Sequence, residues 1–168
     1  MNIYLIGYMY SGKTTVGHKL ALKLGFQWLD LDQFFEAQFH TAIPIFFKRY
    51  GEEAFRQLEH KLLLTTAELD NTVISTGGGT PCHLGNIDWI NAHGKSVYFD
   101  VSVETLLRRA AQSKKPRPIL TGMTEEERAA YIRQQLAARM PYYKKAHIIF
   151  PADKPDLNQL SQLLSASH

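Results

Sequence analysis

The stretch that decides the fold of this chain reads GYMYSGKT and spans residues 7–14. Two glycines lie five positions apart, and a lysine and a threonine follow the second glycine. Residues 2–6, just before the stretch, are mostly apolar like a buried strand, whereas the residues from Lys13 onward have the pattern of a helix. Because a chance match would rarely fall between a strand and a helix, we interpret the stretch as a phosphate-binding loop.

The loop residues predict both the ligand and its contacts. Glycines let the backbone curl until its amide hydrogens point inward, where they and the N-terminus of the next helix bind phosphate. Lys13 is expected to reach the β- and γ-phosphates of ATP, and the Thr14 hydroxyl to bind Mg²⁺. Tyr8 and Tyr10 are bulky for this loop, and we expect their side chains to point outward. The residues predicted to bind ATP here are Gly7, Ser11, Gly12, Lys13, Thr14 and Thr15.

Strand and helix patterns alternate along the whole chain. Strand patterns fall at residues 3–6, 26–29, 72–75, 96–101 and 147–150. Helix patterns fall at 13–24, 33–40, 43–50, 52–69, 103–112 and 155–165, and a capping box at Thr124 starts another helix. Such alternation predicts an α/β fold with a parallel sheet covered by helices on both faces, and ligands at the carboxyl ends of its strands. Right-handed crossovers around a first strand that carries the phosphate loop predict five parallel strands in the order 2-3-1-4-5, the P-loop NTPase type.

Length and composition narrow the class of protein. A chain of 168 residues predicts one domain, residues 1–168. No apolar run approaches the roughly 20 residues of a membrane span, and the first residues lack the pattern of a signal peptide. Cys82 is the only cysteine, so no intrachain disulfide can form, which agrees with a cytoplasmic location. The net charge of +3 is not gathered in a stripe with interleaved aromatics, so we predict no nucleic-acid partner and small anionic substrates instead.

Two aspartates lie at the end of the second predicted strand, in the sequence LDLD at residues 29–32. Residues two apart in an extended backbone point the same way, so Asp30 and Asp32 could both face the phosphate site. One could hold Mg²⁺ through water, and the other could accept the proton of a hydroxyl nucleophile. Capping of the next helix explains either aspartate about as well when it is taken alone. The phosphate loop upstream favours the chemical roles.

Six motifs in one order and spacing make the chain resemble the shikimate kinases, in the nucleoside-monophosphate-kinase-like group of P-loop proteins. Beyond the loop and LDLD, they are GEEAFRQLE at 51–59, STGGG at 75–79, RPIL at 117–120 and RMPYY at 139–143. The resemblance covers nearly the whole chain. It implies ATP-dependent phosphorylation of the 3-hydroxyl of shikimate, a step toward chorismate and the aromatic amino acids, carried out by a monomer.

The resemblance also implies roles for single residues. Asp32 falls where the family contacts the reacting hydroxyl, and Asp30 where it reaches Mg²⁺ through water. Arg56 and Arg139 fall on the two arginines that clamp the substrate carboxylate. Arg117 falls on the lid arginine that reaches the ATP phosphates. The catalytic residues predicted in this way are Lys13, Asp32 and Arg117, and the metal-binding residues are Thr14 and Asp30.

The chemistry of the acceptor site agrees with these roles. A guanidinium fork matches a flat carboxylate with two parallel hydrogen bonds. Gly78 falls on a backbone amide that contacts substrate in the family, and glycines 77–79 have no side chains to keep a ligand away. A solvated Arg56 and a plain flexible turn are the ordinary alternatives, but Glu59 lies three residues after Arg56 and could hold it in place. The predicted substrate-binding residues are Asp32, Arg56, Gly77, Gly78, Gly79 and Arg139.

Two segments are expected to surround the site. Residues 112–123 form the predicted lid, whose closure would exclude water during transfer. Residues 33–62 form the predicted substrate-binding helical segment, with Phe47 and Phe55 expected in the substrate pocket. His40 and Thr41 stand in this segment near the place where relatives usually have a glycine turn.

Adenine contacts follow only from the resemblance. Relatives hold the base between a basic residue after the fourth strand and a loop before the last helix. Arg109 and Pro155 occupy these places, with Arg108 as an alternative to Arg109. An ordinary salt-bridged arginine and a helix-starting proline explain the two residues nearly as well.

Other functions are weighed against the same residues. A kinase for another acceptor, such as a gluconate-type or nucleotide kinase, is less favoured because of the paired arginines and glycines 77–79. A non-enzymatic nucleotide-binding module leaves Asp32 and the lid arginine unexplained. An RNA-binding regulator would need a stripe of basic and aromatic residues, and the sequence has none. The seven histidines lack metal-ligand spacing, so we predict no structural metal, and we interpret Cys82 as a packing residue.

Overall fold

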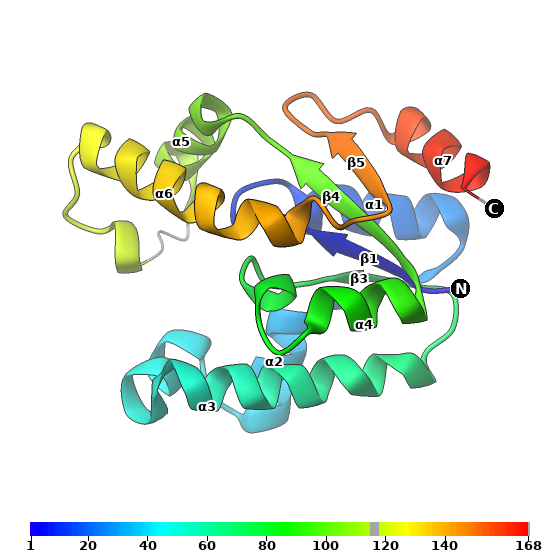
Figure 1. The fold of residues 1–168 in the computed structure, drawn as a ribbon, viewed down its shortest axis with the longest axis horizontal. Coiled ribbons are helices and arrows are strands. Elements are labelled where there is room, and N and C mark those ends of the chain that lie inside the picture. Colours follow the sequence, from blue (N-terminus) through cyan, green and yellow to red (C-terminus); the bar gives the residue numbers. More distant parts are fainter. Residues whose placement is uncertain (115–117, 168) are drawn as a thin grey trace.

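The computed structural model describes residues 1–114 and 118–167 of the protein (Figure 1). Its strands are β1 (Ile3–Ile6), β2 (Gln27–Asp30), β3 (Thr72–Ser75), β4 (Lys95–Asp100) and β5 (Ile148–Pro151). All paired strands run parallel, in the order β2-β3-β1-β4-β5. The predicted sheet order is therefore confirmed, with the strand that leads into the phosphate loop at the centre of the sheet.

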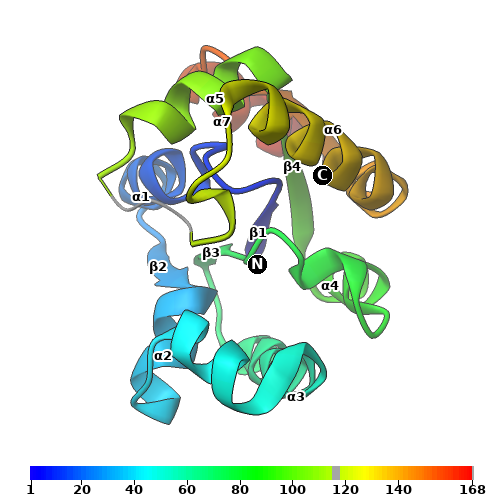
Figure 2. The same ribbon diagram turned by 90° about the vertical axis from the view of Figure 1, so that its left-hand side faces the viewer.

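Helices cover both faces of this sheet. They are α1 (Lys13–Leu24), α2 (Leu31–Phe39), α3 (Ile43–Thr65), α4 (Asn86–His93), α5 (Val103–Gln112), α6 (Glu125–Tyr143) and α7 (Leu157–Ala166), with short 3-10 helices η1 (Thr66–Glu68), η2 (Thr80–Cys82) and η3 (Pro118–Leu120). Helices α1 and α7 contact each other on one face, and α4 lies on the opposite face, as both views show (Figures 1 and 2). No helix in the described ranges has the length and apolar character that crossing a membrane requires.

The core is built around β1. Its four residues are fully buried, because a central parallel strand is covered on both faces. Val73 and Ile74 of β3 and Val97 and Phe99 of β4 continue this apolar layer on either side. The three central strands, β3, β1 and β4, are therefore anchored in the core. The loops that follow their carboxyl ends hold the candidate site.

Several elements differ from the predicted ones. The two helices predicted at 43–50 and 52–69 are present, since α3 consists of two helices that meet at Gly51, whose φ 85° and ψ 171° are non-helical angles that glycine adopts without strain. The last predicted turn of that helix is η1 instead. Helix α2 begins at Leu31, two residues before the predicted start, because Asp30 caps it. The sequence analysis missed α4, a short helix of eight residues.

The turn after α2 keeps the shape that a glycine would give. His40 has φ 52° and ψ 40°, so a left-handed turn ends α2 although the residue is not glycine. Histidine enters this region more readily than branched residues do. At this point of the predicted substrate-binding segment, His40 therefore ends α2 with the left-handed turn that a glycine would make.

Candidate active site

The phosphate loop connects β1 to α1, as predicted. Gly7 and Gly12 adopt φ 148° and φ 91°, which let the backbone curl between them. The Ser11 amide donates to the Tyr8 carbonyl over 3.2 Å, and the Val16 amide donates to the Gly12 carbonyl over 2.9 Å at the start of α1. The loop thus presents its amides next to the N-terminus of a helix, the arrangement that binds phosphate.

Lys13 folds back over this loop. Its Nζ donates to the Gly7 carbonyl over 2.6 Å, to the Tyr8 carbonyl over 3.0 Å and to Ser11 Oγ over 3.4 Å. The residue is buried, with 8% of its surface exposed. The ammonium is therefore fixed above the loop, where a bound triphosphate would place its charge.

The two aspartates have different positions. Asp30 ends β2 and caps α2, since its Oδ1 accepts from the Gln33 amide over 3.0 Å, and its Oδ2 accepts from Thr14 Oγ1 over 3.3 Å. Asp30 therefore both caps α2 and contacts the residue that follows the loop lysine, so the two alternatives are compatible. Asp32 lies in the first turn of α2, so the expectation of an extended backbone through both aspartates is wrong.

Three side chains that the sequence analysis predicts to bind substrate meet at the three glycines after β3. A Cβ on Gly77 would lie 3.0 Å from Asp32 Oδ1, and one on Gly78 would lie 3.0 Å from Arg139 Nη1. A Cβ on Gly79 would collide with the Arg56 guanidinium. Each glycine of the triplet is thus the close neighbour of one predicted substrate-binding side chain, and these side chains come from α2, α6 and α3.

Arg56 is held by a buried carboxylate. Its Nη1 donates to Glu59 Oε1 over 3.0 Å, and the second oxygen of Glu59 accepts from Thr80 Oγ1 over 2.8 Å. Burial raises the pKa of the Glu59 carboxyl, and the Arg56 guanidinium opposes this rise. The Arg56 side chain is only 14% exposed, so it is not a solvated surface charge, and the predicted contact with Glu59 is confirmed.

Two tyrosines that the sequence analysis did not identify, Tyr8 and Tyr143, lie next to Arg139. Its guanidinium lies 5.4 Å above the centre of the Tyr8 ring. Tyr143, one helical turn further along α6, donates its hydroxyl to the Gly78 carbonyl over 2.5 Å and stacks on Tyr98. Tyr8 is 1% exposed, so the expectation that its side chain points outward is wrong. The only available signal was its bulk at a variable position of the loop.

Arg109 joins the phosphate loop to the segment before α7. Its guanidinium donates to the Tyr10 carbonyl over 3.0 Å and to the carbonyls of Ala152 and Asp153 over 2.9 and 3.1 Å. Pro155 follows in that segment but does not start the helix, because Asp156 caps α7. Arg108 is exposed. The structure thus brings Arg109 and the segment that contains Pro155 together.

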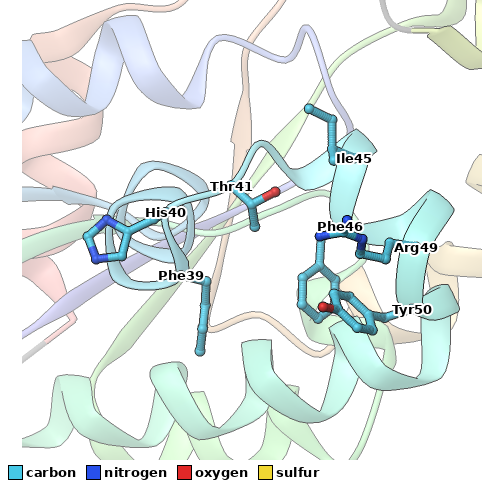
Figure 3. Close-up of a pocket in the computed structure, with 7 residues that line it drawn as sticks. All are labelled: Phe39, His40, Thr41, Ile45, Phe46, Arg49 and Tyr50. Carbon is cyan, nitrogen blue, oxygen red and sulfur yellow. The ribbon is translucent and has the colours of Figure 1, made fainter.

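The predicted substrate-binding segment, residues 33–62, contains an aromatic cluster and a separate pocket. Phe47 and Phe55 contact each other, with ring centres 4.7 Å apart. A pocket of about 350 Å³ opens where α2 meets α3, with Phe39 and Thr41 on one side and Phe46, Arg49 and Tyr50 on the other (Figure 3). Its lining includes neither Phe47 nor Phe55, so it is not the predicted substrate pocket. Arg117 lies outside the described residues.

A P-loop fold with a fixed loop lysine, and with an aspartate and two arginines gathered on a glycine triplet, defines a P-loop kinase with an anionic acceptor. Comparison with known proteins narrows the class. The family model described as shikimate kinase matches residues 9–166. A shikimate kinase of Parabacteroides distasonis is 43% identical over 166 residues, which are 96% of this chain and 96% of that protein. The chain belongs to the shikimate kinase family.

Solved structures agree with this assignment. The crystal structure of shikimate kinase from Bacteroides thetaiotaomicron has a TM-score of 0.95 at 40% identity and covers 98% of both chains. Shikimate kinase from Acinetobacter baumannii in complex with shikimate has a TM-score of 0.84 at 34% identity, over 98% of this chain and 90% of that one. A gluconokinase from Sinorhizobium meliloti, at 16% identity and TM-score 0.61 over 99% of this chain and 90% of that one, shares the fold alone.

Proposed function

We propose that Arg56, Arg139 and Asp32 hold shikimate beside the phosphate loop, for the reaction of this family. In that reaction the γ-phosphoryl group of ATP is transferred to the 3-hydroxyl of shikimate. The observation that carries the proposal is the convergence of these three side chains on glycines 77–79. Two guanidinium groups from α3 and α6 suit a flat carboxylate, and they leave the aspartate for the hydroxyl.

Each of these residues has a separate proposed role in phosphoryl transfer. The hydroxyl oxygen attacks the γ-phosphorus, its proton passes to the Asp32 carboxylate, and ADP leaves. Lys13 offsets the charge of the transferring group, and the loop amides hold the phosphates. Arg109 and Pro155 contact adenine, which the three backbone contacts of Arg109 across this region support.

The lid completes the proposed site. Residues 112–123 would cover the nucleotide and bring Arg117 to its phosphates, which excludes water from the reaction. A pocket of about 280 Å³ between the end of α5 and residues 120–122 supports this role, because its lining also includes Tyr10 of the phosphate loop. We further propose that residues 33–62 form the acceptor-binding segment and that the enzyme acts as a monomer.

Mg²⁺ would bind at Thr14 and Asp30. Hydroxyl and carboxylate oxygens suit this ion, which usually keeps several waters and takes few protein ligands besides the substrate phosphates. Thr14 Oγ1 and Asp30 Oδ2 lie 3.3 Å apart, so one ion could contact the first directly and the second through water. When bound there, the ion would supply positive charge that offsets the charge of the ATP phosphates during transfer.

Asp30→Asn should raise the Mg²⁺ concentration that gives half-maximal rate by about 10–100-fold, the usual cost of losing an outer-shell partner. Asparagine is as good a helix cap as aspartate, so α2 should keep its start and the melting temperature should change little. Titration of the rate with Mg²⁺ at fixed ATP measures the effect. An unchanged Mg²⁺ requirement would remove Asp30 from the metal site.

The proposed carboxylate clamp can be tested by changing either the arginine of the enzyme or the carboxylate of the substrate. A charge-assisted hydrogen bond contributes roughly 1.5–3 kcal/mol, so Arg139→Ala should raise the KM for shikimate by about ten- to over a hundredfold. Arg139→Lys should rescue it only in part, because an ammonium cannot form two parallel bonds. The methyl ester of shikimate should be a poor substrate of the unmodified enzyme.

Arg133→Ala is the matched control, since Arg133 is an exposed arginine of the same helix and should leave shikimate kinetics unchanged. If the ester is phosphorylated as well as the acid and both Arg139 variants keep a normal KM, there is no carboxylate clamp. A neutral polyol would then become the leading acceptor, and parallel assays with other hydroxyl acceptors would identify it.

A further inference from the structure

Tyr8 connects the phosphate loop to the acceptor side of the site. Its ring lies under the Arg139 guanidinium, and its hydroxyl donates to Gln135 Oε1 over 2.6 Å. Gln135 and Arg139 are four residues apart on α6, so they lie on the same face of that helix. One side chain from the loop thus contacts two successive turns of α6.

The backbone of Tyr8 contacts the nucleotide side. Its carbonyl accepts from Lys13 Nζ over 3.0 Å and from the Ser11 amide over 3.2 Å. The next residue, Met9, has its amide nitrogen 3.4 Å from the place where a Cβ on Gly78 would lie. The same short segment therefore borders the proposed phosphate site through its main chain and the proposed acceptor site through its side chain.

The contact with Arg139 is a cation–π interaction. Burial raises the pKa of the Tyr8 phenol, although Arg139 opposes the rise, so the phenol stays protonated and donates to Gln135. The guanidinium thus faces a neutral aromatic ring, which attracts it without neutralising its charge. Arg139 can therefore keep its full charge for a carboxylate while the ring restricts its orientation.

We propose that Tyr8 is a positioning residue that orients Arg139 for the acceptor carboxylate. The proposal rests on the proposed role of Arg139 as part of the clamp. The ordinary alternative is that Tyr8 only fills the core between the loop and α6. The two readings differ in what they predict for shikimate and ATP separately.

Replacement of the ring separates the two readings. Tyr8→Leu and Tyr8→Met, which fill space without an aromatic face, should raise the KM for shikimate by about five- to thirtyfold, the range expected for a partly buried cation–π contact. The KM for ATP should change less than about threefold, because the backbone contacts of residue 8 remain. Tyr8→Phe keeps the ring and should restore the KM for shikimate to within about threefold of normal.

A matched control comes from Tyr4. It is also fully buried with a hydrogen-bonded hydroxyl, which lies 2.8 Å from Thr66 Oγ1, but it belongs to β1 and lies outside the proposed site. Tyr4→Leu should lower the melting temperature without a selective rise in the KM for shikimate. If Tyr4→Leu raises that KM as much as Tyr8→Leu does, general loosening of the core explains the effect and the proposal fails.

The double variant gives the decisive measurement. In an Arg139→Ala background, Tyr8→Met should have little further effect on shikimate binding, because the group that it positions is gone. Independent, multiplicative effects would overturn the proposal. If Arg139→Ala weakens shikimate binding and neither Tyr8→Met nor Tyr8→Leu does, the clamp stands and only the role of Tyr8 fails. If Arg139→Ala itself leaves shikimate binding normal, the clamp fails as well.

Discussion

Asp32→Asn is expected to lower kcat by about 10²–10⁴-fold, the usual contribution of a general base, while ATP binding stays close to normal. The carboxylate lies in the first turn of α2 against the glycine triplet, where we propose that the acceptor binds. Asparagine keeps the size of the side chain but cannot take the hydroxyl proton. Steady-state kinetics and a separate ATP titration would measure the two effects.

Asp88→Asn is the charge-matched control for this variant. Asp88 is an exposed carboxylate on α4 that forms a 3.2 Å ion pair with Lys145, and such surface pairs contribute little. Its loss should leave kcat unchanged. A near-normal turnover of Asp32→Asn would remove Asp32 from proton transfer, and a parallel loss of ATP binding would assign it to the nucleotide instead.

Local signals were enough for much of the fold. Helices α1 and α5 and strands β1 and β3 have the predicted bounds, because each lies between clear breaks in the apolar pattern. Strand order followed from general rules of chain connection rather than from pairing signals. The predicted break between the helices at 43–50 and 52–69 is confirmed, because Gly51 has non-helical backbone angles. The predictions failed at α4, a short helix that the apolar pattern did not indicate.

The same limit applies to the candidate site. The Arg56–Glu59 contact could be predicted because it joins neighbours on one helix. The pairing of each glycine with its own side chain could not, since α2, α3 and α6 meet only in the folded chain. Tyr8 was misread for the same reason. The positions between the two glycines of a phosphate loop have no sequence pattern that predicts where their side chains point. The partners of Tyr8 lie on α6, far away in the sequence.

Lys13→Ala is expected to lower kcat at saturating ATP by about 10²–10³-fold, the typical cost of removing one charged or hydrogen-bonding group that stabilises the transition state. In the structure the ammonium is held by two loop carbonyls and Ser11 Oγ. A bound triphosphate would replace these contacts with charged oxygens, and charge develops on those oxygens during transfer.

The design of this experiment must separate catalysis from folding, because the Gly7 and Tyr8 carbonyls lose a buried donor in the variant. Lys13→Met, which keeps most of the length of the side chain, should lose as much activity as Lys13→Ala even if it is more stable. Lys19→Ala removes the same charge from the exposed side of α1 and should keep normal kcat. Kinetics at saturating ATP, with melting temperatures for all three variants, decide the question. Full activity of Lys13→Met would mean that the loop backbone and the metal carry the phosphate charge without the lysine. A loss that follows the melting temperature across the three variants would mean that Lys13 serves the loop rather than the reaction.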